Sequence, residues 1–140
     1  MKNLLIAIVL LLTVSSCFPK KNDDKDPDPE PELAGAYQVS RLVIGSGSAP
    51  LIPATGNSAS ATVVRSTTDM NKITVSLSGT INGAPASVNI GSFTIRKGSG
   101  SSYDVLNPST NVNEGSINGT DLTLSYTGVN NQQVTLIARK

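Results

Sequence analysis

Histidine and tryptophan are absent from this chain of 140 residues, and cysteine occurs once, at position 17. Without histidine the sequence cannot supply His-based acid–base catalysis, a Ser-His or Cys-His nucleophile pair, or the usual sets of zinc ligands. A single cysteine also excludes an internal disulfide. The composition therefore predicts a protein that is not an enzyme and that holds no metal or cofactor.

Three other sequence patterns could indicate a catalytic or nucleotide-binding site, but a structural interpretation is favoured for each. Asp104 and Glu114 fall on neighbouring predicted strands, where they could form the carboxylate pair of a glycosidase, but two solvated carboxylates on a hairpin are expected instead. Lys72 and Lys97 fall at predicted strand ends, where water would prevent the desolvation that Ser-Lys catalysis needs. Residues 98–103 begin like a dinucleotide-binding fingerprint but join two strands rather than opening a helix.

Charge is sparse beyond position 32 and does not cluster. Residues 33–140 carry seven basic and four acidic side chains, spread along the sequence. Aromatic side chains that could stack on bases are few. We therefore expect no nucleic-acid partner.

The N-terminus has the pattern of an export signal. Lys2 provides a short positive region, and residues 4–14 form an apolar run that only Thr13 interrupts. A helix needs about 20 apolar residues to cross the hydrocarbon core of a bilayer, so this run is too short for a permanent span. Residues 1–16 are therefore predicted to be a removable signal peptide.

The end of this segment resembles the lipobox of bacterial lipoproteins. Val14, Ser15 and Ser16 place an aliphatic residue and two small residues before Cys17. The resemblance implies cleavage after Ser16, acylation of Cys17 by fatty acids such as palmitate, and a lipid anchor in the cell outer membrane, on its periplasmic side or at the cell surface. The alternative is a secreted protein with an incidental cysteine.

A charged, proline-rich segment follows the cysteine. Residues 18–32 contain six acidic residues, three lysines and four prolines, with almost no apolar side chains. Such a composition cannot offset the entropy of ordering, so residues 17–32 are predicted to be a lipidated, disordered tether that reaches up to about 50 Å. Residues 20–24 also resemble the charged surface-export signals of Bacteroidetes lipoproteins, which implies exposure on the cell surface.

The remaining domain, residues 33–140, has a hydrophobic period of two. Ile73, Val75 and Leu77 alternate with hydroxyl residues, and Leu122 and Leu124 do so later in the chain. This alternation places apolar side chains on one face of a strand. We predict eight strands, at 36–44, 60–67, 71–81, 86–96, 102–107, 112–117, 120–127 and 132–139.

The connections between these runs agree with a chain of hairpins. Asn82-Gly83 and Asn118-Gly119 supply the positive φ angles of two-residue type I′ turns. The alternation slips by one residue at 91–92, which is typical of a β-bulge, and residues 45–57 form the one long loop. Because closure removes sheet edges, we predict an all-β, eight-stranded antiparallel up-and-down barrel, with a β-sandwich as the alternative.

Three segments resemble the small lipocalin-like domains of bacterial lipoproteins. Leu33 to Tyr37 is similar to their opening Gly-x-aromatic motif, with Tyr in place of the usual Trp. Residues 115–124 are similar to their late hairpin, and residues 134–139 to their closing strand. The resemblance implies a calycin-type barrel that binds an apolar ligand.

The aromatic residues are the candidate ligand-binding side chains, namely Tyr37, Phe93, Tyr103 and Tyr126. The alternative is that these rings simply fill the core, since one domain needs about this many to pack. The resemblance assigns Tyr37 to the closed floor of the barrel.

Two functions are consistent with these features. One is a lipid-anchored binding module of the cell envelope that holds a small apolar or amphipathic ligand. The other is a non-catalytic interaction or structural lipoprotein whose solid β-domain docks on an envelope protein. Small residues at predicted inward positions, which would leave space for a cavity, are Gly79, Ala86, Ser92 and Ala138.

Overall fold

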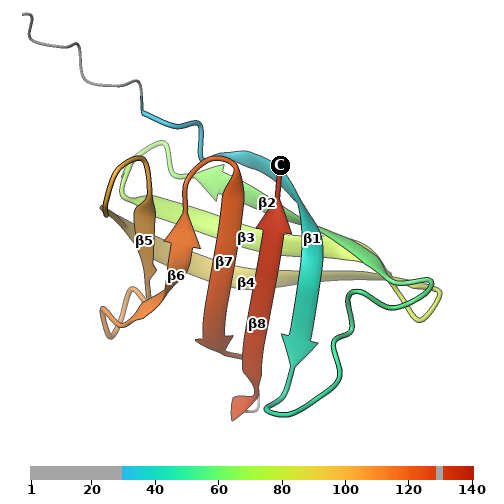
Figure 1. Cartoon of the computed structure of the whole chain (residues 1–140). Helices are drawn as coiled ribbons and strands as arrows, with labels where there is room; N and C mark the ends of the chain where they lie inside the picture. Colours follow the sequence, from blue (N-terminus) through green and yellow to red (C-terminus); the bar gives the residue numbers. More distant parts are fainter. Residues whose placement is uncertain (1–29, 129–130) are drawn as a thin grey trace, which may run out of the picture.

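The computed structural model describes residues 30–128 and 131–140, which form a closed barrel of eight antiparallel strands (Figure 1). Each strand pairs with the next and β8 pairs with β1, so the predicted up-and-down barrel is confirmed and the sandwich is excluded. The predicted signal peptide, the cleavage site at Ser16, Cys17 and the tether up to residue 29 lie outside the described residues. The strands are β1 (Gly35–Ile44), β2 (Ser58–Arg65), β3 (Lys72–Ile81), β4 (Ala84–Lys97), β5 (Tyr103–Leu106), β6 (Asn113–Ile117), β7 (Asp121–Thr127) and β8 (Gln133–Arg139).

The period of two in the sequence gives the barrel its inward face. All eight predicted strands agree with the observed ones to within two residues at each end. Ile73, Val75 and Leu77 are buried on β3, as are Leu122 and Leu124 on β7, so the predicted inward faces are confirmed.

In the described part of the chain, no helix has the length and hydropathy needed to span a membrane.

The two Asn-Gly turns differ in structure. Asn82 and Gly83 both have positive φ, 52° and 78°, and join β3 to β4 as the predicted type I′ turn. The type I′ prediction is wrong at Asn118, which is not among the residues with positive φ. There the Asn118 side-chain oxygen accepts hydrogen bonds from the N–H groups of Thr120 and Asp121, at 2.9 and 2.7 Å, and organises a three-residue connection.

One end of the barrel is closed by the residues that lead into β1. Leu33 and Tyr37 are buried, and the Tyr37 hydroxyl donates a hydrogen bond to the Leu33 carbonyl oxygen at 2.8 Å. The Lys140 ammonium donates to the carbonyl oxygens of Glu32 and Ala34, at 2.7 Å each. Tyr37 therefore lies at the closed floor, and the last residue of the chain meets the entry to β1 at this end (Figure 1).

The last three residues of the predicted tether also lie against the closed end. The Glu30 carboxylate accepts hydrogen bonds from the Arg65 guanidinium, at 3.2 and 3.3 Å, and from the Tyr103 hydroxyl. These bonds, with Arg65 the larger cause, lower the pKa of Glu30. Glu30 and Glu32, which were assigned to the tether, therefore contact the barrel. The partners of Glu30 lie 35 and 73 residues away in sequence, so composition alone did not indicate these contacts.

Strand pairing is incomplete at the opposite end. Residues 94–97 of β4 pair with β5, whereas residues 84–93 pair with β3 alone among the described strands. Strands β2, β3 and β4 consequently extend past the other strands at the right of Figure 1. The long loop 45–57 folds back beside β1, where Ile52 forms a bridge to Leu42 and is 4% exposed. The barrel is therefore closed at one end and open at the other.

Candidate ligand-binding cavity

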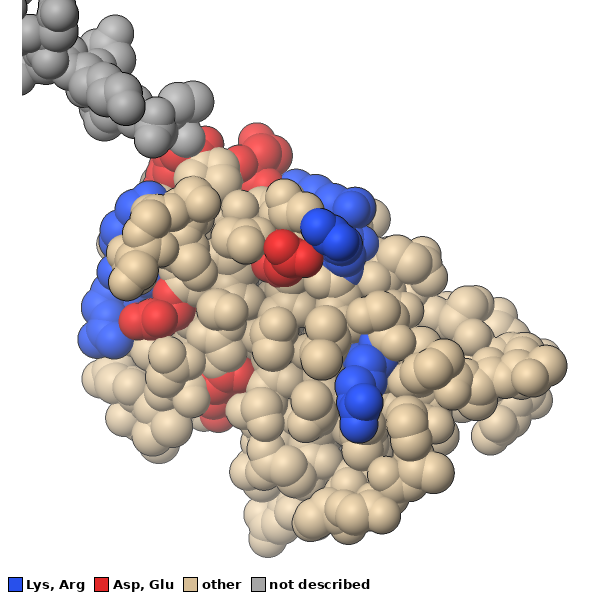
Figure 2. Space-filling model, in the orientation of Figure 1, with Lys and Arg blue, Asp and Glu red and all other residues tan. Residues whose placement is uncertain are grey.

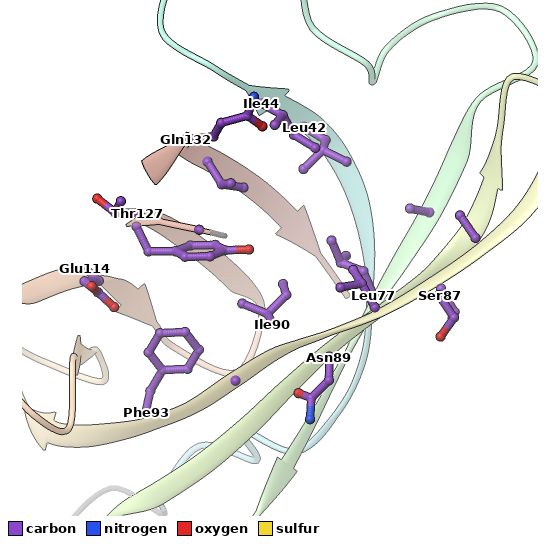
Figure 3. Close-up of a pocket in the computed structure, with 18 of the residues that line it drawn as sticks. Leu42, Ile44, Leu77, Ser87, Asn89, Ile90, Phe93, Glu114, Thr127 and Gln132 are labelled. Atoms are coloured by element: carbon purple, nitrogen blue, oxygen red, sulfur yellow. The ribbon is translucent and has the colours of Figure 1, made fainter. Parts of the chain in front are cut away.

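A cavity of about 690 Å³ occupies the open end of the barrel (Figure 3). This volume lies within the range of small-molecule binding sites, about 300–1,000 Å³. Ile44 and Val88 on its wall are 39% and 55% exposed, so the cavity opens to solvent. Its larger aliphatic and aromatic lining residues are Leu42, Ile44, Leu51, Leu77, Ile81, Val88, Ile90, Phe93, Tyr126 and Val134.

Two groups of strands provide this wall. Strands β3 and β4 form one side, and the ends of β1 and β7 with the start of β8 form the other. Gly79 and Ala86 lie opposite each other in the β3–β4 ladder and both line the cavity. Ser92 also lines the cavity, whereas Ala138 is buried elsewhere in the core. Three of the four small residues expected to leave space therefore surround the cavity.

The four aromatic candidates divide between the two ends of the barrel. Phe93 and Tyr126 line the cavity, and their ring centroids lie 6.3 Å apart. Tyr37 and Tyr103 lie at the closed end, where their hydroxyls donate to the Leu33 carbonyl oxygen and to the Glu30 carboxylate. The structure thus brings two of the four candidates to one site.

The β-bulge predicted in β4 contributes directly to the cavity. Ser76 pairs with Asn89 and Val75 with Gly91, so Ile90 is an extra residue without a partner on β3. The bulge is confirmed and lies one residue before the predicted position. Bulges change the direction in which a side chain points, and here Ile90 becomes part of the cavity wall.

A second bulge, in β6, places Glu114 at the cavity. Val105 pairs with Gly115 and Leu106 with Asn113, so Glu114 is the residue that the register skips. A Cβ atom at Gly115 would collide with the backbone of β7, so a side chain would not fit beside the bulge. The sequence pattern predicted a solvated hairpin face for Glu114, and this prediction is wrong, because the bulge places the residue at the cavity.

Polar groups are concentrated at the rim. Glu114 Oε1 accepts a hydrogen bond from Asn107 Nδ2 at 3.1 Å, and Thr127 and Gln132 line the same cavity. Figure 3 shows Glu114 on the same side of the cavity as Phe93 and Thr127. Burial, followed by the Glu114 charge, raises the pKa of Tyr126. The cavity therefore combines an apolar wall with one carboxylate.

The other polar candidates lie away from this cavity. Asp104 forms an ion pair with Arg96 at 3.1 Å, so it does not pair with Glu114. Lys72 pairs with Asp69 at 3.2 Å, and Lys97 lies over the Tyr103 ring. The prediction of a solvent-exposed position holds for both lysines.

Within residues 30–128 and 131–140, no group of three His, Cys, Asp or Glu side chains is arranged to hold a metal ion. Comparison with protein-family models, curated proteins and solved structures finds no match to this chain. The cavity is therefore the feature from which a function is inferred.

Proposed function

We propose that the protein is a lipid-anchored binding module of the bacterial cell envelope and that its barrel holds a small apolar or amphipathic ligand. The observation that carries the proposal is the cavity of about 690 Å³ with its aliphatic and aromatic wall. An apolar ligand that enters it gains about 25 cal/mol for each Å² removed from water. The resemblance of residues 14–17 to a lipobox supports the anchor and the outer-membrane location.

One end of the barrel suits membrane anchoring, and the other end suits ligand binding. The chain enters at the closed end, where Glu30 and Leu33 pack, and the cavity opens at the other end. Charged side chains gather toward the closed end in the face shown in Figure 2, whereas the rest of that face is largely uncharged. A lipid on Cys17 would therefore attach at the end remote from the cavity, which leaves the mouth accessible to ligand.

The alternative is a non-catalytic interaction or structural lipoprotein whose solid β-domain docks on an envelope protein. The edge of β4 at residues 84–93 favours it, because an unpaired edge is a template for a partner strand. However, Pro85 and the bulge at Ile90 interrupt this edge, and both features discourage strand addition. A solid domain would also need no cavity, so we favour the binding module.

Filling the cavity tests the proposal. Ala59 lines it and is 6% exposed, whereas Val64 lies on the outer face of the same strand and is 57% exposed. The test uses the full mature chain carrying Cys17→Ser, residues 17–140 produced without the signal peptide. In it, Ala59→Phe should abolish binding of the neutral fluorescent probe N-phenyl-1-naphthylamine. The matched variant Val64→Phe should bind the probe as the parent chain does.

Melting temperature would show that both variants fold. Native mass spectrometry of the parent chain would show which small molecules it retains from the cells that made it. A parent chain that neither binds the probe nor retains any ligand would contradict the binding-module proposal.

A further inference from the structure

We propose that the ligand is a cationic amphiphile, an apolar chain with a protonated amine whose head group pairs with Glu114 at the rim of the cavity. This inference rests on the proposed binding function and names its ligand class.

The first observation is that Glu114 differs from the other carboxylates of the barrel in its ion pairing. The barrel strands and their connections carry four acidic residues, and three of them form ion pairs with basic residues. Among the described residues, Glu114 has no cationic partner within ion-pair distance. The three pairs are Asp69 with Lys72 at 3.2 Å, Asp104 with Arg96 at 3.1 Å, and Asp121 with Arg139 at 3.3 Å.

The second observation is the way in which Glu114 is held. Its Oε1 atom accepts a hydrogen bond from Asn107 Nδ2 at 3.1 Å, which orients the carboxylate. Among the described residues, none donates a hydrogen bond to its Oε2 atom. One oxygen is therefore fixed by the protein and the other is available to a ligand donor. An ammonium group can use it in a charge-assisted hydrogen bond, which is stronger than a neutral one.

The third observation is the charge of the whole lining. It contains Glu114 and no Lys or Arg, so its side chains have a negative formal charge. Two of the basic residues, Arg65 and Lys140, are bound at the closed end by Glu30 and by carbonyl oxygens. A fatty carboxylate in the cavity would meet Glu114 without a counter-charge, whereas an amine would find its partner there.

The position of Glu114 also fits an amphiphile. Glu114 lines the same cavity as Phe93 and Ile90. The apolar tail of a bound ligand can therefore contact apolar side chains while the ligand's head group contacts the carboxylate. Near a protein surface the effective dielectric is still lower than in bulk water, so the attraction between the two charges is stronger there than in solution. The same carboxylate penalises an anionic head group by repulsion. Head-group charge should therefore decide affinity among ligands with the same chain.

Three ligands with one chain length test this inference: octylamine, 1-octanol and octanoate. At pH 7.5 the first is cationic, the second neutral and the third anionic. Each would compete with N-phenyl-1-naphthylamine for the full mature chain carrying Cys17→Ser. We expect octylamine to bind at least about tenfold more tightly than octanoate, which corresponds to about 1.4 kcal/mol.

Two variants assign the preference to Glu114. Glu114→Gln removes the charge at nearly constant size, and should bring the affinities for octylamine and octanoate to within about twofold of each other. Asp104→Asn removes a charge outside the cavity and should keep the preference for the amine. Melting temperatures would verify that both variants fold.

The outcomes separate the two proposals. If the parent chain binds all three ligands and holds octanoate as tightly as octylamine, the amine preference is overturned and the binding function stands. If Glu114→Gln keeps the full preference, the assignment to Glu114 is overturned. If the probe binds and none of the three ligands displaces it, the amine proposal is overturned and the binding function stands. If the parent chain neither binds the probe nor retains any ligand, both proposals are overturned.

Discussion

Phe93 of β4 and Tyr126 of β7 meet edge to face inside the barrel, with ring centroids 6.3 Å apart and planes inclined by 73°. Phe93 belongs to the main hydrophobic core, and Tyr126 packs against that core while partly exposed. Both rings also line the cavity. The pair therefore marks the boundary between the filled part of the barrel and the open part.

Removing one ring of this pair should destabilise the barrel. Phe93 is 4% exposed, so Phe93→Ala should lower the free energy of unfolding by about 3–5 kcal/mol. Val88 lies on the same strand but is 55% exposed, and Val88→Ala should change it by only about 0.5 kcal/mol. Urea denaturation measures the free energy of unfolding of both variants. Similar small losses at the two positions would show that Phe93 contributes little to the core.

The alternation along β7 gives a second stability prediction. Leu124 is fully buried, so Leu124→Ala should cost about 2–5 kcal/mol of unfolding free energy. Thr123 lies next to it on the outer face, and Thr123→Ala should cost under about 0.5 kcal/mol. Urea denaturation of the two variants would check the asymmetry. Large, equal losses would mean that a partner or another layer covers the outer face.

The strands were predictable because their signal is local. Ile73, Val75 and Leu77 alternate with hydroxyl residues, and no tertiary information is needed to read a period of two. The Asn82-Gly83 turn was predictable for the same reason, since both residues tolerate positive φ. Closure into a barrel then follows from eight sequential antiparallel strands. The two edge strands of such a sheet gain a partner on their free side when the first strand pairs with the last.

The candidate site was predictable only in part, because it depends on strand register. Phe93 and Tyr126 were identified as aromatic candidates, but nothing local separates them from Tyr37 and Tyr103 at the other end. Glu114 was placed on the wrong face, since its direction is set by a bulge against β5. The adjacent glycine is the sequence signal that could have suggested this bulge.

The proposed lipid anchor makes a prediction about processing. If Cys17 is acylated before the signal peptide is removed, Cys17→Ser should prevent both lipidation and cleavage after Ser16. Several acyl chains anchor a protein firmly because each buried methylene contributes about 0.8 kcal/mol. Metabolic labelling with a fatty-acid probe, together with the size of the product, would check this. Label that persists on the serine variant would contradict the assignment.

The contacts of Glu30 predict that the N-terminal boundary affects stability. A chain that starts at Leu33 lacks the bonds from Arg65 and Tyr103 to Glu30, and the bond from Lys140 to the Glu32 carbonyl oxygen. It should therefore melt at a lower temperature than a chain that starts at Pro27. Glu30→Gln in the longer chain should lower the melting temperature in the same direction. Equal melting temperatures for all three would mean that these contacts add no stability.

Tyr37 should make the barrel sensitive to alkali. Burial, with smaller contributions from the charges of Glu32 and Asp121, raises the pKa of Tyr37 to about 12. An unfolded tyrosine ionises near its ordinary pKa of about 10. Between these two values the unfolded chain releases a proton that the native chain keeps. The stability that this difference provides is complete below about pH 10 and is lost as the pH rises toward about 12.

Tyr37→Phe separates this effect from the loss of a hydrogen bond. At pH 8 the variant should lose about 0.5–1.5 kcal/mol, because the bond from the hydroxyl to the Leu33 carbonyl oxygen is missing. Above pH 10 its unfolding free energy should fall less steeply than that of the parent chain. Some decline should remain, since burial also raises the pKa of Tyr126 and the Glu30 hydrogen bond raises that of Tyr103. Urea denaturation between pH 8 and pH 12 would compare the slopes, and parallel curves would assign the alkaline loss to the other tyrosines.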